Sequence, residues 1–409
     1  MIVRLESPVP AHAVSPVESV AEALDHWCAG ERVEVLSSEF LDVLAAVPDP
    51  RNTRGRRYSL VALLAIAILA TAAGMRSYAG FATWSATAPE QVLARLGIRF
   101  RRPSEKTFRS VLSRLDPVDL DRRLGAYFTM LAAASAEGGL LAVALDGKTL
   151  RGARRAGAVA AHLVSVFAHH ARLVLGQLAV AEKSNEIPCV RKLLRVFRNV
   201  WLVVTVDAMH TQTATAKLIC STLKSHYLMI VKHNQPKLLA RITALPWREV
   251  PVVDTEEPKP AHGRAERRTL KVLTVARGIG FPYAKQVVQI TRERVVVATG
   301  EPSVEVVYAI CSAAFELARP AEIAAWLREH WGIENRVHYV RDVTFDEDRS
   351  SVRAGAAPQV MATLRNTALN LHRLRGADNI AEACRTTAFT ADRGLDLLVD
   401  HRITRSQAC

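Results

Sequence analysis

Two short apolar runs, each followed directly by an aspartate, constrain the fold of this chain most strongly. Residues 140–145 (LLAVAL) lead into Asp146, and residues 200–206 (VWLVVTV) lead into Asp207. Continuous apolar runs of this length are typical of strands that are covered on both faces. If the two strands are neighbours, both carboxylates emerge at the edge where open α/β sheets bind ligands. The alternative is that each aspartate only caps a helix or forms a turn.

The segments around these runs predict a mixed α/β sheet with helices packed on it. Runs rich in β-branched residues predict further strands, and amphipathic stretches predict helices between them. The expected strands are residues 140–145, 162–168, 172–181, 200–206 and 227–231, and the expected helices are residues 187–197, 213–223, 321–342 and 358–375.

Residues 1–135 carry patterns that are typical of helices. Ser104 is placed to cap one helix, and Pro117 after Asp116 opens the next one at a first-turn position. The most apolar stretch, residues 60–75, is too short for a bilayer span, which needs about 20 residues. We therefore expect a buried core helix there. The expected helices are residues 17–28, 39–46, 59–85, 90–96, 104–115 and 117–134.

Residues 240–300 depart from this pattern, because their apolar residues alternate with polar ones. A period of two is typical of strands that have one solvated face. The last thirty or so residues are weakly patterned. The sequence therefore predicts five parts: an all-helical N-terminal domain (1–135), the first part of an α/β core (136–239), a β-rich insertion (240–300), the second part of the core (301–375) and a C-terminal tail (376–409).

The charge of the chain favours a polyanionic partner. Lys and Arg number 54 against 40 Asp and Glu, which gives a net charge of +14. Such a chain attracts nucleic acid first and an anionic membrane second. The six cysteines form no C-x-x-C pair, so neither a zinc site nor a redox motif is expected. We expect a cytoplasmic protein without a signal peptide, because the N-terminus lacks an apolar segment after a charged start.

Two basic clusters in the helical part carry an aromatic residue beside them. They are residues 51–58 (RNTRGRRY) and residues 99–103 (RFRRP). Such clusters suit contact with phosphate, and solvated loops are the alternative.

A third carboxylate, Glu334 in HWGIENRVHY, lies on a helix that follows the insertion. Together with Asp146 and Asp207 it would form a site of oxygen ligands, which suits Mg²⁺ bound to substrate phosphate. A group of acidic residues just after this helix could replace Glu334 as the third ligand, although their charge also offsets nearby arginines. This group comprises Asp342, Asp346, Glu347 and Asp348.

Several polar residues near the expected sheet edge are candidates for DNA contact. Lysine neutralises phosphate, and side-chain amides donate to and accept from bases or backbone. A solvated surface is the alternative for each of them. His210 is either a supporting group, a DNA contact or a structural histidine. The candidates are Lys148, Lys232, Asn234 and Gln235 in the core and Arg264 and Arg268 in the insertion.

A series of motifs runs in order along residues 38–375. The helical part contains DPRNTRGRRYSLVALLAIAILA, SYAGFATWS and PSEKTFRSVLSRLD. The core contains ALDGKTLRG, AEKSNEIP, VTVDAMHTQ, LMIVKHNQPKL, HGRAERR, HWGIENRVHYVRDVTFDEDRS and MATLRNTALNLHR. In this order and spacing the chain resembles a DDE-class insertion-sequence transposase of the ISAs family. The resemblance implies a helical N-terminal domain and an RNase H-like catalytic core.

The resemblance also implies the site and its chemistry. Asp146, Asp207 and Glu334 match the family's metal-binding triad, and the 127 positions from Asp207 to Glu334 leave room for a β insertion. Two Mg²⁺ or Mn²⁺ ions would serve cleavage at the element's ends and transfer of 3′ ends to target DNA. The implied partners are double-stranded DNA, with inverted repeats recognised by the N-terminal part, and further copies of the chain on that DNA. No membrane partner is implied, and the active protein would be nucleoid-associated.

The chain departs from a broader transposase pattern, Tyr-x-x-Arg-x-x-x-Glu followed by Lys. Leu327 stands at the tyrosine place, His330 at the arginine place and Arg341 at the lysine place. One phosphate contact of that group is therefore in doubt, while His330 and Arg341 can still bind phosphate. The alternatives to a transposase are a catalytically inert or domesticated DNA-binding protein of the same fold, a nuclease that does not transfer strands, and a membrane-associated protein.

Overall fold

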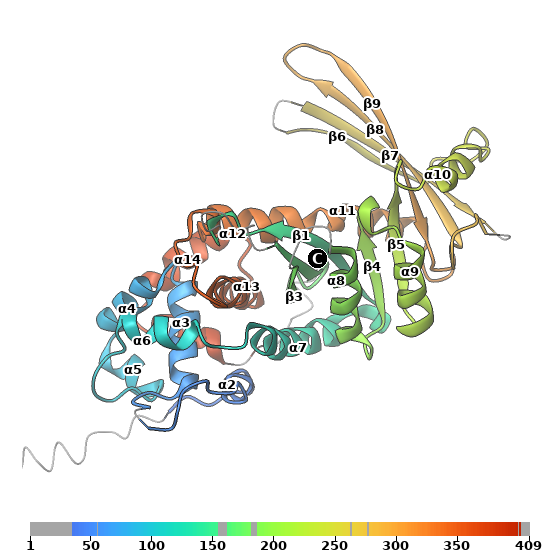
Figure 1. The fold of residues 1–409 in the computed structure, drawn as a ribbon. Helices are drawn as coiled ribbons and strands as arrows, with labels where there is room; N and C mark the ends of the chain where they lie inside the picture. Colours follow the sequence, from blue (N-terminus) through green and yellow to red (C-terminus); the bar gives the residue numbers. More distant parts are fainter. Residues whose placement is uncertain are drawn as a thin grey trace, which may run out of the picture.

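A nine-stranded mixed sheet runs through the structure, a computed structural model that describes residues 35–54, 56–153, 162–180, 186–261, 264–275, 278–399 and 401. The strand order is β3-β2-β1-β4-β5-β9-β8-β7-β6. Helices pack on one end of this sheet, while its other end extends away as a long twisted ribbon (Figure 1). The mixed α/β architecture expected from the sequence is confirmed. The expected helix at residues 17–28 lies outside the described residues.

The first five strands form the core of the sheet. β1 is parallel to β4, β4 is parallel to β5, and β2 lies antiparallel between β1 and β3. Unlike the expected strand at residues 140–145, β1 continues past Asp146, because its later residues pair with β2 up to Thr149 and His162. The bounds are β1 (Leu141–Thr149), β2 (His162–Ala168), β3 (Val174–Val180), β4 (Leu202–Val206) and β5 (His226–Val231).

The remaining four strands extend the core sheet. β9 pairs antiparallel with β5, and β8, β7 and β6 follow as an antiparallel meander. Burial in β8 and β9 changes along each strand: the ends next to the core are buried on both faces, and the outer ends are largely exposed. The bounds are β6 (Asp254–Ala261), β7 (Arg264–Thr274), β8 (Gln286–Val296) and β9 (Pro302–Cys311), so the last strand runs past residue 300.

Six helices occupy the described residues between 35 and 135. The sequence predicted one helix over residues 59–85, but the structure has two, because Gly74 adopts a left-handed conformation with φ of 84°. α3 is buried along nearly its whole length. No described helix combines the length and the apolarity that a bilayer span requires. The bounds are α2 (Glu39–Ala45), α3 (Leu60–Ala72), α4 (Tyr78–Thr87), α5 (Glu90–Arg95), α6 (Glu105–Leu112) and α7 (Pro117–Ser135).

A long helix near the C-terminus joins the helical part to the sheet. α13 (Ala357–Leu374) is buried almost throughout and packs against α3, α7 and β3. Asn370 on this helix accepts from the Val174 N–H and donates to the Val174 carbonyl, each at 2.8 Å. α14 (Ile380–Phe389) then packs against α13 and α3, so part of the weakly patterned tail is an ordinary packed helix.

Shorter helices connect the strands of the core and carry the residues considered below. They are α8 (Glu186–Leu194), α9 (Thr213–Lys217), α10 (Pro236–Thr243), α11 (Pro320–His330) and α12 (Tyr339–Val343). Between α11 and α12 the chain forms a π-helical turn, η7 (Glu334–His338).

Candidate active site

Asp146 and Asp207 lie on adjacent parallel strands. The β1–β4 ladder ends with Leu145 opposite Val206, so the two aspartates are the next residue on each strand. β4 stops there, while β1 continues with Asp146 opposite Ser165 of β2. Because both positions follow the last rung of one parallel ladder, the structure brings the two carboxylates to the same place along the sheet.

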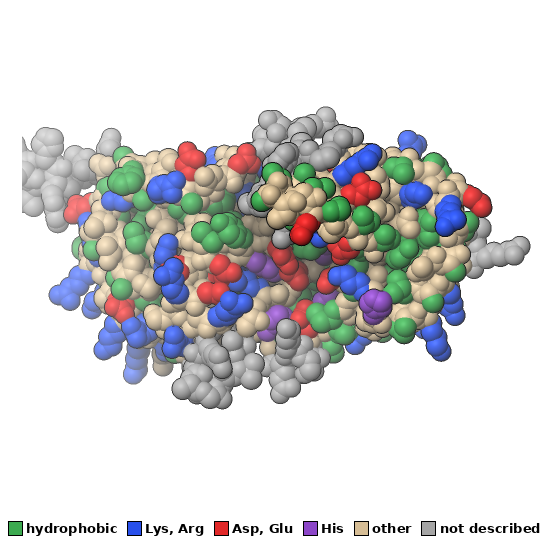
Figure 2. Space-filling model, turned by 90° about the horizontal axis from the view of Figure 1, so that it is seen from above, with side chains coloured by type: hydrophobic (Ala, Val, Ile, Leu, Met, Phe, Trp, Pro, Cys, Tyr) green, Lys and Arg blue, Asp and Glu red, His purple; other side chains and the backbone are tan. Residues whose placement is uncertain are grey.

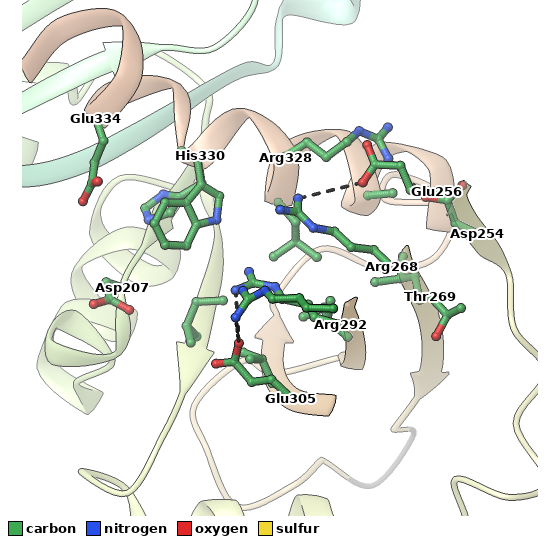
Figure 3. A pocket seen from close by; sticks show the side chains of 18 of the residues that line it. Asp207, Asp254, Glu256, Arg268, Thr269, Arg292, Glu305, Arg328, His330 and Glu334 are labelled. Atoms are coloured by element: carbon green, nitrogen blue, oxygen red, sulfur yellow. Dashed lines mark hydrogen bonds and ion pairs between the residues drawn. The ribbon is translucent and has the colours of Figure 1, made fainter. Parts of the chain in front are cut away.

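Glu334 reaches this place from the helices that cover the sheet. α11 packs on β1, β4 and β5, and the chain then enters η7 at Glu334. π-helical turns are rare and are found often at functional sites. Glu334 and Asp207 lie on the same side of the close-up view, with His330 near Glu334 (Figure 3).

All three carboxylates line one cavity of about 380 Å³ between the core and the insertion. The core side contributes the three acids, Lys232 and His330, and the insertion contributes Arg268, Arg292 and Arg294 together with Asp254, Glu256 and Glu305. Leu327 and Ile290 are among its apolar lining residues. Seen from above, acidic and histidine side chains gather in a hollow near the middle of the molecule, with Lys and Arg side chains around it (Figure 2).

The cavity carboxylates, Asp146, Asp207 and Glu334, have few partners. The Asp207 side chain is 58% exposed, and its Oδ1 lies 3.9 Å from Lys232 Nζ. Asp146 Oδ2 lies 3.3 Å from His338 Nδ1, and Glu334 is exposed. Carboxylates that share a cavity and keep free lone pairs are the donor set that Mg²⁺ accepts, with waters and phosphate oxygens as the other ligands. Within the described ranges, no three such side chains are close enough to hold an ion as they stand.

His330 is held by the core of the sheet. Its Nδ1 lies 2.9 Å from Thr205 Oγ1, whose hydroxyl donates to the Val143 carbonyl at 3.1 Å. Burial lowers the pKa of His330, and the neighbouring Asp146 and Asp207 only partly offset this effect. The ring is therefore neutral near pH 7, and in that form one ring nitrogen is a donor and the other an acceptor.

The polar residues after β5 divide into two roles. Lys232 is 56% exposed beside Asp207 and lines the cavity. The amide groups of Asn234 and Gln235 instead donate to the carbonyls of Ala208 at 2.6 Å and Thr211 at 2.8 Å. These two amides brace the segment that follows Asp207.

Lys148 and Arg341 do not reach the cavity. Lys148 is buried, and its Nζ donates to both carboxylate oxygens of Asp342 at 2.6 Å. Arg341 is fully buried, and its guanidinium binds Glu347 with Nε–Oε2 at 2.9 Å. A DNA contact by either residue would require an ion pair to break.

The acidic group on and just after α12 is also committed elsewhere. Asp346 binds Arg76 at 3.0 Å and Arg349 at 2.8 Å. Glu347 lies between Arg341 and Arg365; burial raises its pKa, but the two guanidinium groups outweigh this and lower it to about 2. None of the four acids, Asp342, Asp346, Glu347 and Asp348, lines the cavity that holds Glu334.

In the insertion, Arg268 lies opposite Arg292 on the neighbouring strand, and both line the cavity. The Arg292 guanidinium stacks 5.6 Å from the ring centroid of Trp331, and Arg294 pairs with Glu305 at 3.3 Å. Dashed lines in Figure 3 mark ion pairs between these arginines and Glu256 and Glu305. The side chain of Arg264 lies outside the described residues.

A buried network beneath the aspartates was missed by sequence reasoning. Glu186 at the start of α8 contacts His162 Nε2 at 2.8 Å and His210 Nε2 at 3.1 Å. Burial raises the pKa of Glu186, but these hydrogen bonds outweigh it and lower the pKa to about 2. A Cβ on Gly147 would lie 2.4 Å from the His162 ring, so only glycine fits beside Asp146. The available signal was Glu186 in the AEKSNEIP motif and His210 three residues after Asp207.

Comparison with known proteins identifies the family of this chain. The family model described as "Transposase DDE domain" matches residues 137–371, and one described as "DDE_Tnp_1-associated" matches residues 41–128. The chain is 27% identical to "H repeat-associated putative transposase YhhI" of Escherichia coli strain K12, over 81% of this chain and 90% of the relative. It is 28% identical to "Putative transposase YncI" of Escherichia coli O157:H7, over 81% and 87%.

Among solved structures, the piggyBac transposase synaptic complex with hairpin DNA aligns with a TM-score of 0.40 at 10% identity, covering 90% of this chain and 78% of that one. The family match spans more than half of the chain and includes both strand aspartates and Glu334. The chain belongs to the DDE transposase family.

Proposed function

We propose that this protein is the DNA transposase of an insertion sequence. It binds the element's terminal inverted repeats, cleaves phosphodiester bonds at the ends and joins the 3′ ends to target DNA. The observation that carries the proposal is the cavity shared by Asp146, Asp207 and Glu334, in a chain of net charge +14. We assign the five strands β1–β5 to an RNase H-like core, which is compatible with their mixed order.

Asp146, Asp207 and Glu334 would hold two divalent ions, Mg²⁺ or Mn²⁺, which when bound activate the attacking oxygen and stabilise the leaving one. Lys232 beside Asp207 neutralises charge on the scissile phosphate. Neutral His330 accepts or donates one hydrogen bond and adds no charge. Asn234 and Gln235 fix the segment after Asp207, so the carboxylate keeps its position on the sheet.

The wall of the insertion supplies three arginines to the cavity. Arg268, Arg292 and Arg294 face the carboxylates across it, and their ion pairs with Glu256, Glu266 and Glu305 hold the guanidinium groups in place. DNA phosphates entering the cavity would exchange these carboxylate partners for phosphate, which the arginine fork binds bidentately. The partner is double-stranded DNA, and the active form is a homo-oligomer on that DNA.

The test is cleavage of a labelled duplex that carries the element's own inverted repeat, with Mg²⁺. Asp146→Ala, Asp207→Ala and Glu334→Ala are compared with the wild type, and Asp342→Ala serves as a matched acidic control outside the cavity. We expect cleavage at the repeat boundary that is lost in the three cavity variants while DNA binding persists. Full cleavage by Glu334→Ala would show that another residue is the third metal ligand.

Two results would favour the alternatives. Binding without cleavage by the wild type, with correct ends and metal, would identify a catalytically inert DNA-binding protein. Cleavage without joined products, when a target duplex is present, would identify a nuclease that does not transfer strands.

A further inference from the structure

A second cavity, of about 400 Å³, lies in the helical part of the chain, far along the sequence from the carboxylates. It is formed by described residues of the segment 51–58, by one side of α6 and by Arg114 just after this helix. No acidic residue is among the described residues that line it. The lining comprises five arginines, namely Arg51, Arg54, Arg56, Arg57 and Arg114, together with Asn52, Tyr58, Thr107, Ser110 and Val111.

Two of the five arginines build the segment. Arg51 forms a bidentate ion pair with Asp49, with Nε–Oδ1 at 2.9 Å, and also donates to the Tyr58 carbonyl at 2.9 Å. This bonding lowers the pKa of Asp49. Arg56 donates to the carbonyls of Arg51 and Asn52. The segment therefore holds a defined shape through its own arginines.

The other three arginines are not neutralised. Arg54, Arg57 and Arg114 are exposed, and none forms an ion pair with an acidic side chain in the part of the chain that the structure describes. Arg114 is oriented by donating to the Ser110 carbonyl at 2.6 Å and the Ser110 hydroxyl at 3.0 Å. Three exposed positive charges in one concave site, whose lining also carries the hydroxyl groups of Thr107 and Ser110, create a local positive potential that attracts an anion.

We propose that this arginine pocket binds successive phosphates of a DNA duplex backbone. Guanidinium forks match phosphate oxygens bidentately, and the hydroxyls of Thr107 and Ser110 add neutral donors. The inference rests on the proposed function, because the polyanion is taken to be the element's DNA. It adds a contact site in the DDE_Tnp_1-associated part that is separate from the cavity carboxylates. Phosphate contacts position a protein on DNA without reading its sequence.

The basic cluster at residues 99–103 is not part of this pocket. There Arg102 donates to the carbonyls of Ser85 and Ala86 at the end of α4. Of the two basic clusters identified in the sequence, only the one at residues 51–58 contributes to this concave cationic site.

The experiment measures binding of the full chain to a labelled duplex by fluorescence anisotropy across a series of salt concentrations. The triple variant Arg54→Ala/Arg57→Ala/Arg114→Ala removes the free charges from exposed positions. The control Lys192→Ala/Arg195→Ala/Arg198→Ala removes the same charge from exposed positions on and after α8. We expect the triple variant to bind at least about tenfold more weakly, with a salt slope reduced by about 1 for each lost contact.

An equal loss in the control would overturn the pocket assignment, because net charge alone would then explain the effect. An unchanged slope in the triple variant would also overturn it. A wild type that binds no duplex at all would instead reject the proposed function. If the pocket binds small anions instead, the triple variant should lose binding of pyrophosphate and keep its affinity for DNA. This result would overturn the duplex assignment.

The variant Arg54→Lys/Arg57→Lys/Arg114→Lys separates charge from geometry. Lysine keeps the positive charge but lacks the planar fork. We expect the salt slope to be kept and part of the affinity to be lost. Wild-type affinity in this variant would overturn the bidentate geometry.

Discussion

Asp207 and Glu334 stand exposed at a cavity, whereas Glu347 lies fully buried between the guanidinium groups of Arg341 and Arg365. Glu186 and Asp121 share the second situation, since each is buried and accepts hydrogen bonds from groups on other elements. We call Glu347, Glu186 and Asp121 the buried carboxylates.

The difference lies in how many partners each group already has. A buried carboxylate without partners would cost several kcal/mol, so those in the interior are saturated with donors. The cavity carboxylates have lone pairs left over, which is what binding of a cation requires. Removing a cavity carboxylate should therefore reduce activity and spare stability, and removing Glu347, which is held by two buried guanidinium groups, should do the reverse.

The largest expected effect is that of Glu334→Gln on cleavage. The neutral amide keeps the size of the side chain but weakens a metal ligand, so we expect cleavage to fall by about 10³-fold or more. The melting temperature should stay near that of the wild type, because Glu334 is exposed. Both quantities are measured on the same preparation. A large drop in melting temperature would show that Glu334 also supports the fold. It would contradict the distinction between cavity carboxylates and buried carboxylates.

Glu347→Ala should give the reverse result. It leaves the buried Arg341 and Arg365 without their carboxylate, and we expect a loss of about 3–5 kcal/mol in the free energy of unfolding. Chemical denaturation measures this loss. The control is Glu316→Ala, which removes an acidic side chain from an exposed position. Wild-type stability of Glu347→Ala would contradict the structural role.

Asp121 should make stability depend on pH. Burial raises its pKa to about 7, although the hydrogen bonds from Gln177 and Thr363 lower it in part. Because the folded pKa lies above the unfolded one, the protonated group's contribution is fully present below about pH 4 and is lost as pH rises through 7. The free energy of unfolding of Asp121→Asn, relative to that of the wild type, should therefore rise by about 2–4 kcal/mol from pH 4 to pH 8. Chemical denaturation at pH 4 and pH 8 measures this change. The same difference between variant and wild type at both pH values would contradict the prediction.

Glu186→Gln tests the network beneath the aspartates. The carboxylate of Glu186 offers a negatively charged oxygen to each of His162 and His210. The amide of glutamine is neutral and has only one oxygen acceptor, so it cannot replace both contacts. We expect cleavage to fall by about 10–100-fold, the range found for groups that orient metal ligands. Glu249→Gln, on the surface, is the matched control. If cleavage is unchanged while the melting temperature falls, Glu186 is structural only and does not position Asp146 and Asp207.

The smallest effect is expected at the ion pair between Arg328 and Asp254, at 3.1 Å. Both side chains are more than a third exposed, so water screens the attraction and the pair contributes about 0–1 kcal/mol. Asp254→Asn should therefore leave denaturation curves nearly unchanged. A loss above this range would mean that the insertion is docked on α11 by this contact.

Much of the fold could be predicted from local patterns. The apolar runs before Asp146 and Asp207 form β1 and β4, and the helices at residues 39–46, 90–96 and 117–134 lie close to α2, α5 and α7. The cap at Ser104 and the first-turn proline Pro117 were read correctly from the residues themselves. The break at Gly74 was not, because glycine inside a helical pattern is often tolerated and its φ depends on the chain that follows.

The candidate site was only partly predictable. Asp146, Asp207, Glu334, Lys232 and His330 all line the cavity. Lys148 was a candidate together with Lys232, and Arg341 was one through the broader transposase pattern. Each of Lys148 and Arg341 is nevertheless held by an acid in the segment 342–347. Nothing in the sequence around Lys148 indicates a partner 194 positions away.

By itself, the sequence determined that two aspartates directly follow buried strand segments, because burial imposes a local apolar pattern that can be read residue by residue. That these strands are neighbours was decided by the tertiary structure. The tertiary structure alone decided which charged groups stay free. The pairing of two charges depends on the distance between them in space. The three arginines of the pocket and the carboxylates of the cavity stay available because the fold places few oppositely charged side chains near them.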